Sequence, residues 1–119
     1  SKVFDVFARY ETSIDMITTS EIAVSLTIDN TSNLDAILTE LVQFSQVVVD
    51  DKQSIICLVG NAVNRHPDTY KLFQVLQDVQ VRMISFGGSD HNISILVATE
   101  DKKRALSLLQ EYMFATPVA

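Results

Sequence analysis

A group of polar side chains interrupts the alternating apolar pattern of the stretch IDMITTSEIAVSLTID, residues 14–29. Alternation on both sides of the interruption is typical of two β-strands joined by a turn. Two-residue hairpin loops usually contain Gly or Asn because their central residues need positive φ, yet this turn reads Thr18-Thr19-Ser20-Glu21. Hydroxyl and carboxylate groups form hydrogen bonds readily, so we interpret the turn as a candidate for ligand contact.

A purely structural interpretation of this turn stays open. Thr18, Thr19 and Ser20 can satisfy the backbone of their own turn, as hydroxyl side chains often do, while Glu21 is solvated. Under this interpretation the polar residues stabilise the hairpin and bind no ligand.

The other reactive residues form no catalytic or metal-binding pattern. Cys57, His66 and His91 lack any metal-ligand spacing. Asp50-Asp51 is predicted to be a solvated turn, and Cys57, within the apolar run SIICLVG, a small buried core residue. We therefore expect no catalytic residue and no metal site in this chain.

Composition restricts the class of protein. The 119 residues are 47% hydrophobic, enough for a packed core in one ordinary domain or two very small ones. The net charge of −6 argues against a nucleic-acid partner. No apolar run is long enough for a membrane span, no signal peptide is present, and a single cysteine fits a reducing compartment. We expect a cytoplasmic protein that does not contact membranes.

Hydrophobic periodicity predicts the elements that position these residues. Asn33 or Ser32 is expected to cap the second helix, and Asp101 to lie in the first turn of the last one. Phe4, Phe7 and Tyr10 form one stripe on the first helix, predicted to be core or interface. Helices are predicted over residues 2–11, 33–44, 62–78 and 101–113, and strands over 13–18, 21–29, 46–50, 54–59, 80–86 and 91–98.

The chain also contains an internal repeat. A shift of about 69 residues aligns Phe4 with Phe73 and Ala36-Ile37 with Ala105-Leu106, and it aligns VSL at 24–26 with ISI at 93–95. The repeat predicts an α+β fold of two ferredoxin-like βαββαβ units, each with helices on one face of an antiparallel sheet. The first unit, 1–50, lacks its opening strand and the second, 51–114, its closing one; residues 115–119 form a tail.

Three stretches carry a resemblance to a known family: VFDVFARYETSIDMITTSEIAVSLTID, CLVGN and VRMISFGGSDHNISILV. They resemble the tandem ACT regulatory domains of aspartate kinases, most closely of the lysine-sensitive kind. The resemblance implies a regulatory fragment that is not itself catalytic. It also implies a parent enzyme whose kinase domain phosphorylates aspartate with ATP and Mg²⁺, so no cofactor is expected in this chain.

The resemblance also implies an effector site in the first unit. Two carboxylates there, Asp15 and Glu21, favour L-lysine, which carries two ammonium groups, over neutral threonine. The family closes this site with residues of a first strand that would lie upstream of Ser1. The residues that match the family's effector-binding positions are Ser13, Ile14, Asp15, Ser20, Glu21 and Ile22.

Two further segments could contact a ligand. The stretch SFGGSDHNIS, residues 85–94, is interpreted as a long hairpin connection rather than a second effector loop. Gly60-Asn61 lies at a strand-to-helix junction where a ligand carboxylate can approach backbone amides, but we expect this site to be unused for an effector in the second unit.

Two functions remain open from the sequence. The chain is either an amino-acid sensor or an ACT-type dimerisation module that binds no ligand by itself. Because the first unit lacks a strand, we expect a homodimer or higher homo-oligomer in which a second copy repairs the vacancy.

Overall fold

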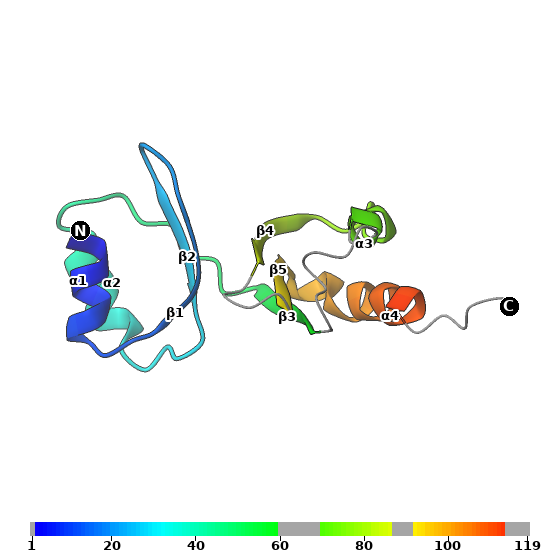
Figure 1. The fold of residues 1–119 in the computed structure, drawn as a ribbon. Coiled ribbons are helices and arrows are strands. Elements are labelled where there is room, and N and C mark those ends of the chain that lie inside the picture. Colours follow the sequence, from blue (N-terminus) through cyan, green and yellow to red (C-terminus); the bar gives the residue numbers. More distant parts are fainter. Residues whose placement is uncertain (1, 60–69, 87–91, 114–119) are drawn as a thin grey trace, which may run out of the picture. The chain divides into compact units, whose positions relative to one another are not determined.

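The computed structural model describes residues 2–59, 70–86 and 92–113 (Figure 1). The chain divides into two compact units, Ser1–Val49 and Asp50–Ala119. In each unit an antiparallel sheet carries helices on one face, so the expected α+β ferredoxin-like class is confirmed. No helix in this part of the chain is long and apolar enough to cross a membrane.

The first unit contains two helices and a two-stranded sheet. Its elements are α1 (Lys2–Arg9), β1 (Ile14–Thr19), β2 (Val24–Ile28) and α2 (Leu34–Leu41). Val6 and Phe7 of α1 pack against Ile37 and Leu41 of α2, and the sheet adds half-buried apolar side chains to this core. The predicted stripe on α1 is only partly correct, because Phe7 is buried whereas Phe4 is exposed.

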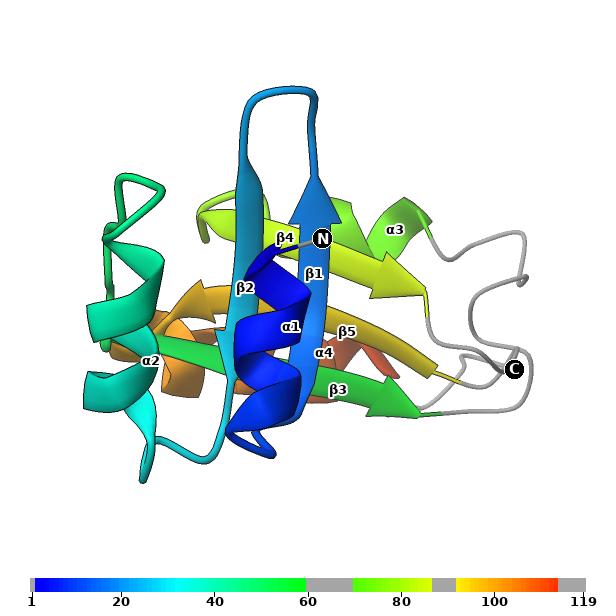
Figure 2. The ribbon, with the colours of Figure 1, turned by 90° about the vertical axis from the view of Figure 1, so that its left-hand side faces the viewer.

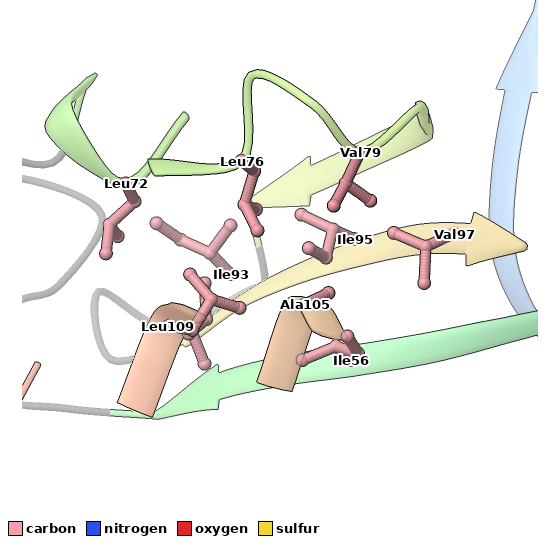
Figure 3. Close-up of a cluster of buried hydrophobic side chains, with 10 residues drawn as sticks. Ile56, Leu72, Leu76, Val79, Ile93, Ile95, Val97, Ala105 and Leu109 are labelled. Atoms are coloured by element: carbon pink, nitrogen blue, oxygen red, sulfur yellow. The ribbon is translucent and has the colours of Figure 1, made fainter. Parts of the chain in front are cut away.

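The second unit has a three-stranded sheet in the order β3-β5-β4. Its elements are β3 (Gln53–Val59), α3 (Tyr70–Val75), β4 (Val81–Phe86), β5 (Asn92–Ala98), the 3-10 turn η1 (Thr99–Asp101) and α4 (Lys102–Met113). Figure 3 shows its core, in which side chains from both helices and from β3 and β5 meet. Asp101 lies in η1, directly before α4. The buried core residues are Ile56, Leu58, Leu72, Leu76, Val79, Ile93, Ile95, Val97, Ala105 and Leu109.

The predicted repeat is visible as the shared order helix, strand, strand, helix in both units. Its helices, however, align with a shift of 68 residues, since 105 − 37 = 68. Ile37 of α2 and Ala105 of α4 are the buried counterparts, not Ala36 and Ala105.

The two units differ in one strand. In the second unit β5 lies between β3 and β4. In the first, no strand within the described residues lies on the far side of β2, the counterpart of β5. Val24 of β2 is therefore 41% exposed, whereas Ile93, at the equivalent place in β5, is 0% exposed.

Three predictions about individual segments need correction or lie outside the described residues. Residues 46–50 form no strand, and Val48 is 95% exposed. The closing strand of a βαββαβ unit pairs with its opening strand, and no opening strand lies within the described residues, so this segment has no strand beside it there. The predicted helix over 62–78 is described only from Tyr70 onward, and Gly60-Asn61, His66 and His91 lie outside the described residues.

Cys57 is exposed, so the prediction that it is a buried core residue is wrong. Successive side chains of a strand point to opposite faces. Ile56 and Leu58 take the core face of β3, which leaves Cys57 on the other face.

Candidate functional site

The connection between β1 and β2 comprises the four residues 20–23, because Thr18 and Thr19 belong to β1 (Figure 2). The predicted turn therefore had the wrong bounds. The amide of Ser20 donates to the carbonyl of Ala23 at 2.8 Å. Among the described non-glycine residues only Glu11 has positive φ. This longer loop thus has no position that requires Gly or Asn.

The side chains of the loop divide into two kinds. The hydroxyl of Ser20 accepts a 3.1 Å hydrogen bond from the amide of Ala23, so it stabilises its own turn as the structural interpretation predicts. Glu21 and Ile22 are exposed. All three loop residues predicted to contact a ligand are therefore exposed, and the hydroxyl of Ser20 is already hydrogen-bonded within the loop.

At the other end of β1, Asp15 is the extra residue of a β-bulge. Ile14 pairs with Ile28 and Met16 with Thr27, which leaves Asp15 without a cross-strand partner. The amide of Met16 donates to the hydroxyl of Thr27 at 3.0 Å, closing the bulge. Bulges re-aim side chains, and here the carboxylate of Asp15 is exposed.

Ser13 and Ile14, directly before Asp15, differ in burial. Ser13 is exposed, whereas Ile14 packs against the core of the first unit. Ile14 therefore anchors the start of β1 rather than offering its side chain to a ligand.

The predicted site residues form two groups at opposite ends of β1. Asp15 and Ser20 are five residues apart on an extended strand, which corresponds to about 17 Å. That span exceeds the length of a free amino acid. One copy of the chain therefore does not surround a single ligand with all six residues.

The segment before Ser13 is held by an unusual helix end. The amide of Thr12 donates to the carbonyl of Phe7 at 2.9 Å, and that of Glu11 to Ala8 at 3.0 Å. Glu11 has φ = 50°. This is the pattern of a Schellman motif with a left-handed residue at its end, a position that glycine usually takes because side chains are strained there.

The carbonyl of Tyr10 accepts hydrogen bonds from two side chains. The amide nitrogen of Asn33 donates to it at 2.9 Å and the hydroxyl of Thr12 at 3.1 Å. Asn33 occupies the predicted N-cap position of α2 but makes no side-chain capping bond. We define Tyr10, Thr12 and Asn33 as the helix junction. No sequence pattern indicates this junction, because Tyr10 and Asn33 are 23 residues apart.

Glu40 of α2 forms an ion pair that also connects α1 with α2. The guanidinium of Arg9 lies 2.7 Å from its carboxylate. Interaction with the nearby Tyr10 hydroxyl and with Arg9 lowers the pKa of Glu40, and the Glu40 carboxylate in turn raises the pKa of Tyr10. Arg9 and Glu40 line a hollow of about 350 Å³ between α1 and α2.

The second unit repeats the bulge with the opposite charge. Val81 pairs with Val97 and Met83 with Leu96, so Arg82 is the extra residue of β4. Asp50 accepts hydrogen bonds from the Lys52 amide and the Gln53 side chain, which lower its pKa, and the positive charge of Arg82 adds to this effect. Asp50 therefore acts within its own turn.

Residues 2–59, 70–86 and 92–113 contain no cluster of three or more His, Cys, Asp or Glu side chains that could hold a metal ion.

Known proteins share this arrangement. An ACT-domain family model matches residues 56–113. A solved chain assigned as a C-terminal regulatory domain of aspartate kinase from Porphyromonas gingivalis W83 is 44% identical with a TM-score of 0.82, over 95% of this chain and 78% of that one. This chain belongs to the aspartate kinase regulatory domains. The predicted resemblance is confirmed, and the units described above are ACT units.

Curated relatives of this regulatory region are whole aspartokinases. The lysine-sensitive aspartokinase 3 of Escherichia coli K12 is 36% identical over 96% of this chain and 27% of its own length. A solved structure of E. coli aspartokinase III in complex with lysine and aspartate is 33% identical with a TM-score of 0.79, over 95% of this chain and 27% of that one. The regulatory region spans about a quarter of the length of these relatives.

Proposed function

We propose that this chain is the effector-binding part of an aspartate kinase and mediates feedback inhibition by an end-product amino acid, lysine in preference to threonine. The observation that carries the proposal is the exposed carboxylate of Asp15, presented by a bulge at the start of β1. A carboxylate binds an ammonium group through a charge-assisted hydrogen bond. The similarity to E. coli aspartokinase III, solved with lysine, supports the choice of effector.

The backbone of β1 offers partners for the effector's carboxylate. Ser20 and Ala23 are hydrogen-bonded to each other, and inward and outward backbone groups alternate along an antiparallel ladder. The amides of Ile17 and Thr19 therefore point away from β2. No strand in the described residues occupies this side of β1, so these amides are available to an anionic group wherever a partner strand does not pair with them.

A second copy of the chain would complete the site. If β1 pairs antiparallel with β1 of a second copy about a two-fold axis, residues 13–15 of one copy lie opposite residues 20–22 of the other. Each of the two resulting sites then combines Asp15 from one copy with Glu21 from its partner. Under this proposal the homodimer is a requirement for effector binding, and the six site residues act as two half-sites.

Catalysis belongs to the rest of the parent protein under this proposal. We infer that the parent transfers a phosphoryl group from ATP to aspartate, and that ATP and Mg²⁺ bind outside this regulatory region. The chain's own contribution is to bind the effector.

The test is inhibition of the full-length kinase by a panel of aspartate-family amino acids. We expect lysine to lower the turnover of aspartate at concentrations where threonine has little effect. Inhibition by threonine alone would overturn the effector assignment. Insensitivity to every amino acid in the panel would overturn the sensor function.

One observation favours a second function, a dimerisation module that binds no ligand. The hydroxyl of Ser20 is already used by its own loop. The two functions differ in thermal unfolding, because a ligand that binds only the native state raises the melting temperature. A dimer whose melting temperature does not respond to millimolar lysine would support the second function.

A further inference from the structure

The helix junction lies directly before the proposed effector segment, residues 13–15. Thr12 is only 7% exposed, and its hydroxyl bonds to the carbonyl of Tyr10. Asn33 reaches the same carbonyl from the start of α2. The last carbonyls of a helix have no partner within the helix, so these two side chains fix the end of α1 from outside.

We infer that Thr12 and Asn33 are positioning residues that set the place of Ser13 and Asp15 for the effector; this inference rests on the proposed function. Between the junction and the segment, the direction of the chain depends on Glu11, whose backbone is left-handed. Non-glycine residues leave this conformation readily, since it costs about 1–2 kcal/mol. The two donors on the Tyr10 carbonyl hold the neighbouring peptide in place.

The junction is also tied to the far end of α2. Arg9, the last residue of α1, forms an ion pair with Glu40 at 2.7 Å. Asn33 and Glu40 are seven residues apart, about 10 Å along a helix. The C-terminal end of α1 thus contacts α2 at two places, through the Tyr10 carbonyl to Asn33 and through Arg9 to Glu40. A shift of the effector segment would be transmitted to the position of α2.

Loss of one donor should reduce the apparent affinity for the effector, because fewer molecules then hold residues 13–15 in the binding geometry. The apparent dissociation constant rises in inverse proportion to the fraction of molecules whose segment is in place. A single hydrogen bond changes such a population by about fivefold. Contacts made by the bound effector itself are unchanged.

The experiment compares two threonines of the first unit in the full-length kinase. Thr12→Val removes the junction hydroxyl, and Thr12→Ser keeps it. Thr39→Val is the matched control, because the hydroxyl of Thr39 also donates to a backbone carbonyl, that of Asp35, at 2.9 Å, but away from the junction. We expect Thr12→Val to raise the half-inhibitory lysine concentration about fivefold with unchanged uninhibited turnover. Thr12→Ser and Thr39→Val should stay close to the original value.

Amide hydrogen exchange on the 119-residue chain provides a readout that does not depend on the effector. Thr12→Val should speed exchange of the amides of residues 13–15 relative to those of α2, and Thr39→Val should not. If Thr12→Val does not fold, Asn33→Ala removes the other donor from an exposed residue and gives the same comparison.

Several outcomes would overturn the inference. Equal shifts in Thr12→Val and Thr39→Val would show a general loss of stability, and unchanged lysine sensitivity in Thr12→Val would show that the junction does not position the site. If the unmodified kinase ignores lysine, the proposed function fails. Amide exchange of residues 13–15 in Thr12→Val then decides whether the junction orders this segment. Exchange equal to that of the unmodified chain would refute this ordering role.

Discussion

Asp15 and Arg82 occupy equivalent positions in the two ACT units: each is the extra residue of a β-bulge, and each directly precedes a methionine. A β-bulge leaves one residue without a cross-strand partner and changes the direction of its side chain. In the first unit this side chain attracts an ammonium group, and in the second it repels one. The repeat therefore preserves the geometry of the bulge and reverses its charge, which under the proposed function would favour a cationic effector in the first unit only.

Replacing the charge at the first bulge should weaken inhibition. Asp15→Asn in the full-length kinase keeps the size of the side chain but removes the charge that an ammonium group would meet. A charged hydrogen bond contributes roughly 1.5–3 kcal/mol, so the inhibitory lysine concentration should rise at least about tenfold with near-normal uninhibited turnover. Arg82→Gln, at the equivalent place in the second unit, is the control and should leave the inhibition curve unchanged. Unaltered lysine sensitivity of Asp15→Asn would refute the assignment.

Association of the isolated chain should depend on a strand edge. At low micromolar concentration, light scattering should give at least twice the 13.3 kDa monomer mass. Ile17→Pro removes an outward amide of β1 and should release monomers, since proline cannot donate to a new ladder. Val24→Pro removes an outward amide of β2 and should leave the dimer intact. The reverse result would place the contact at β2, and a monomeric unmodified chain would contradict both arrangements.

The unpaired edge of β2 in the described residues should be measurable as a difference in stability between equivalent core positions of the two units. Ile95 is fully buried, so Ile95→Ala should lower the free energy of unfolding by about 2–5 kcal/mol. Leu26, its counterpart in β2, is only half-buried. Leu26→Ala should therefore cost less than about 2 kcal/mol, because part of its side chain is already in water. Urea unfolding of the two variants provides the comparison, and equal losses would mean that the open edge of β2 is covered.

Relief of backbone strain at Glu11 should stabilise the chain. Glycine adopts φ = 50° without the steric penalty of a side chain. Glu11→Gly should therefore raise the free energy of unfolding by up to about 1 kcal/mol, the penalty being partly offset by the greater freedom of unfolded glycine. Glu11→Ala removes the carboxylate but keeps the strain, so it should give no gain. Destabilisation by glycine would show that the carboxylate matters more than the backbone.

The link between Arg9, Tyr10 and Glu40 should make stability depend on pH. Since the folded-state pKa of Glu40 is lowered, its contribution is present above its unfolded pKa and is lost as the pH falls through the folded value. The pKa of Tyr10 is raised, so its contribution is lost at alkaline pH as the pH rises through the folded value. Asp50 acts in the same direction as Glu40. Urea unfolding between pH 7 and pH 3 should show a shallower acid loss in Glu40→Gln than in the unmodified chain, and identical slopes would refute the link.

The order of the elements and the internal repeat could be predicted from the sequence because they depend on local periodicity. Strands were predicted over 13–18 and 54–59 and are observed as Ile14–Thr19 and Gln53–Val59. Alternating apolar residues specify which face of a strand is buried wherever neighbours exist on both sides. The same period indicates that Cys57 points away from Ile56 and Leu58, although its apolar surroundings suggested burial.

Only the tertiary structure decided what depends on partners distant in the sequence. Residues 46–50 have a strand-like composition, but a strand forms only when another lies beside it to accept its hydrogen bonds. The bulge at Asp15 follows from the register of β1 with β2. The side-chain amide of Asn33 donates to the carbonyl of Tyr10 instead of capping its own helix. The sequence by itself determined which residues are candidates for effector binding. The length of β1 separates those residues into two groups, whereas pairing with β2 decided that Asp15 lies in a bulge, because hydrogen-bond register is a property of two strands and not of one.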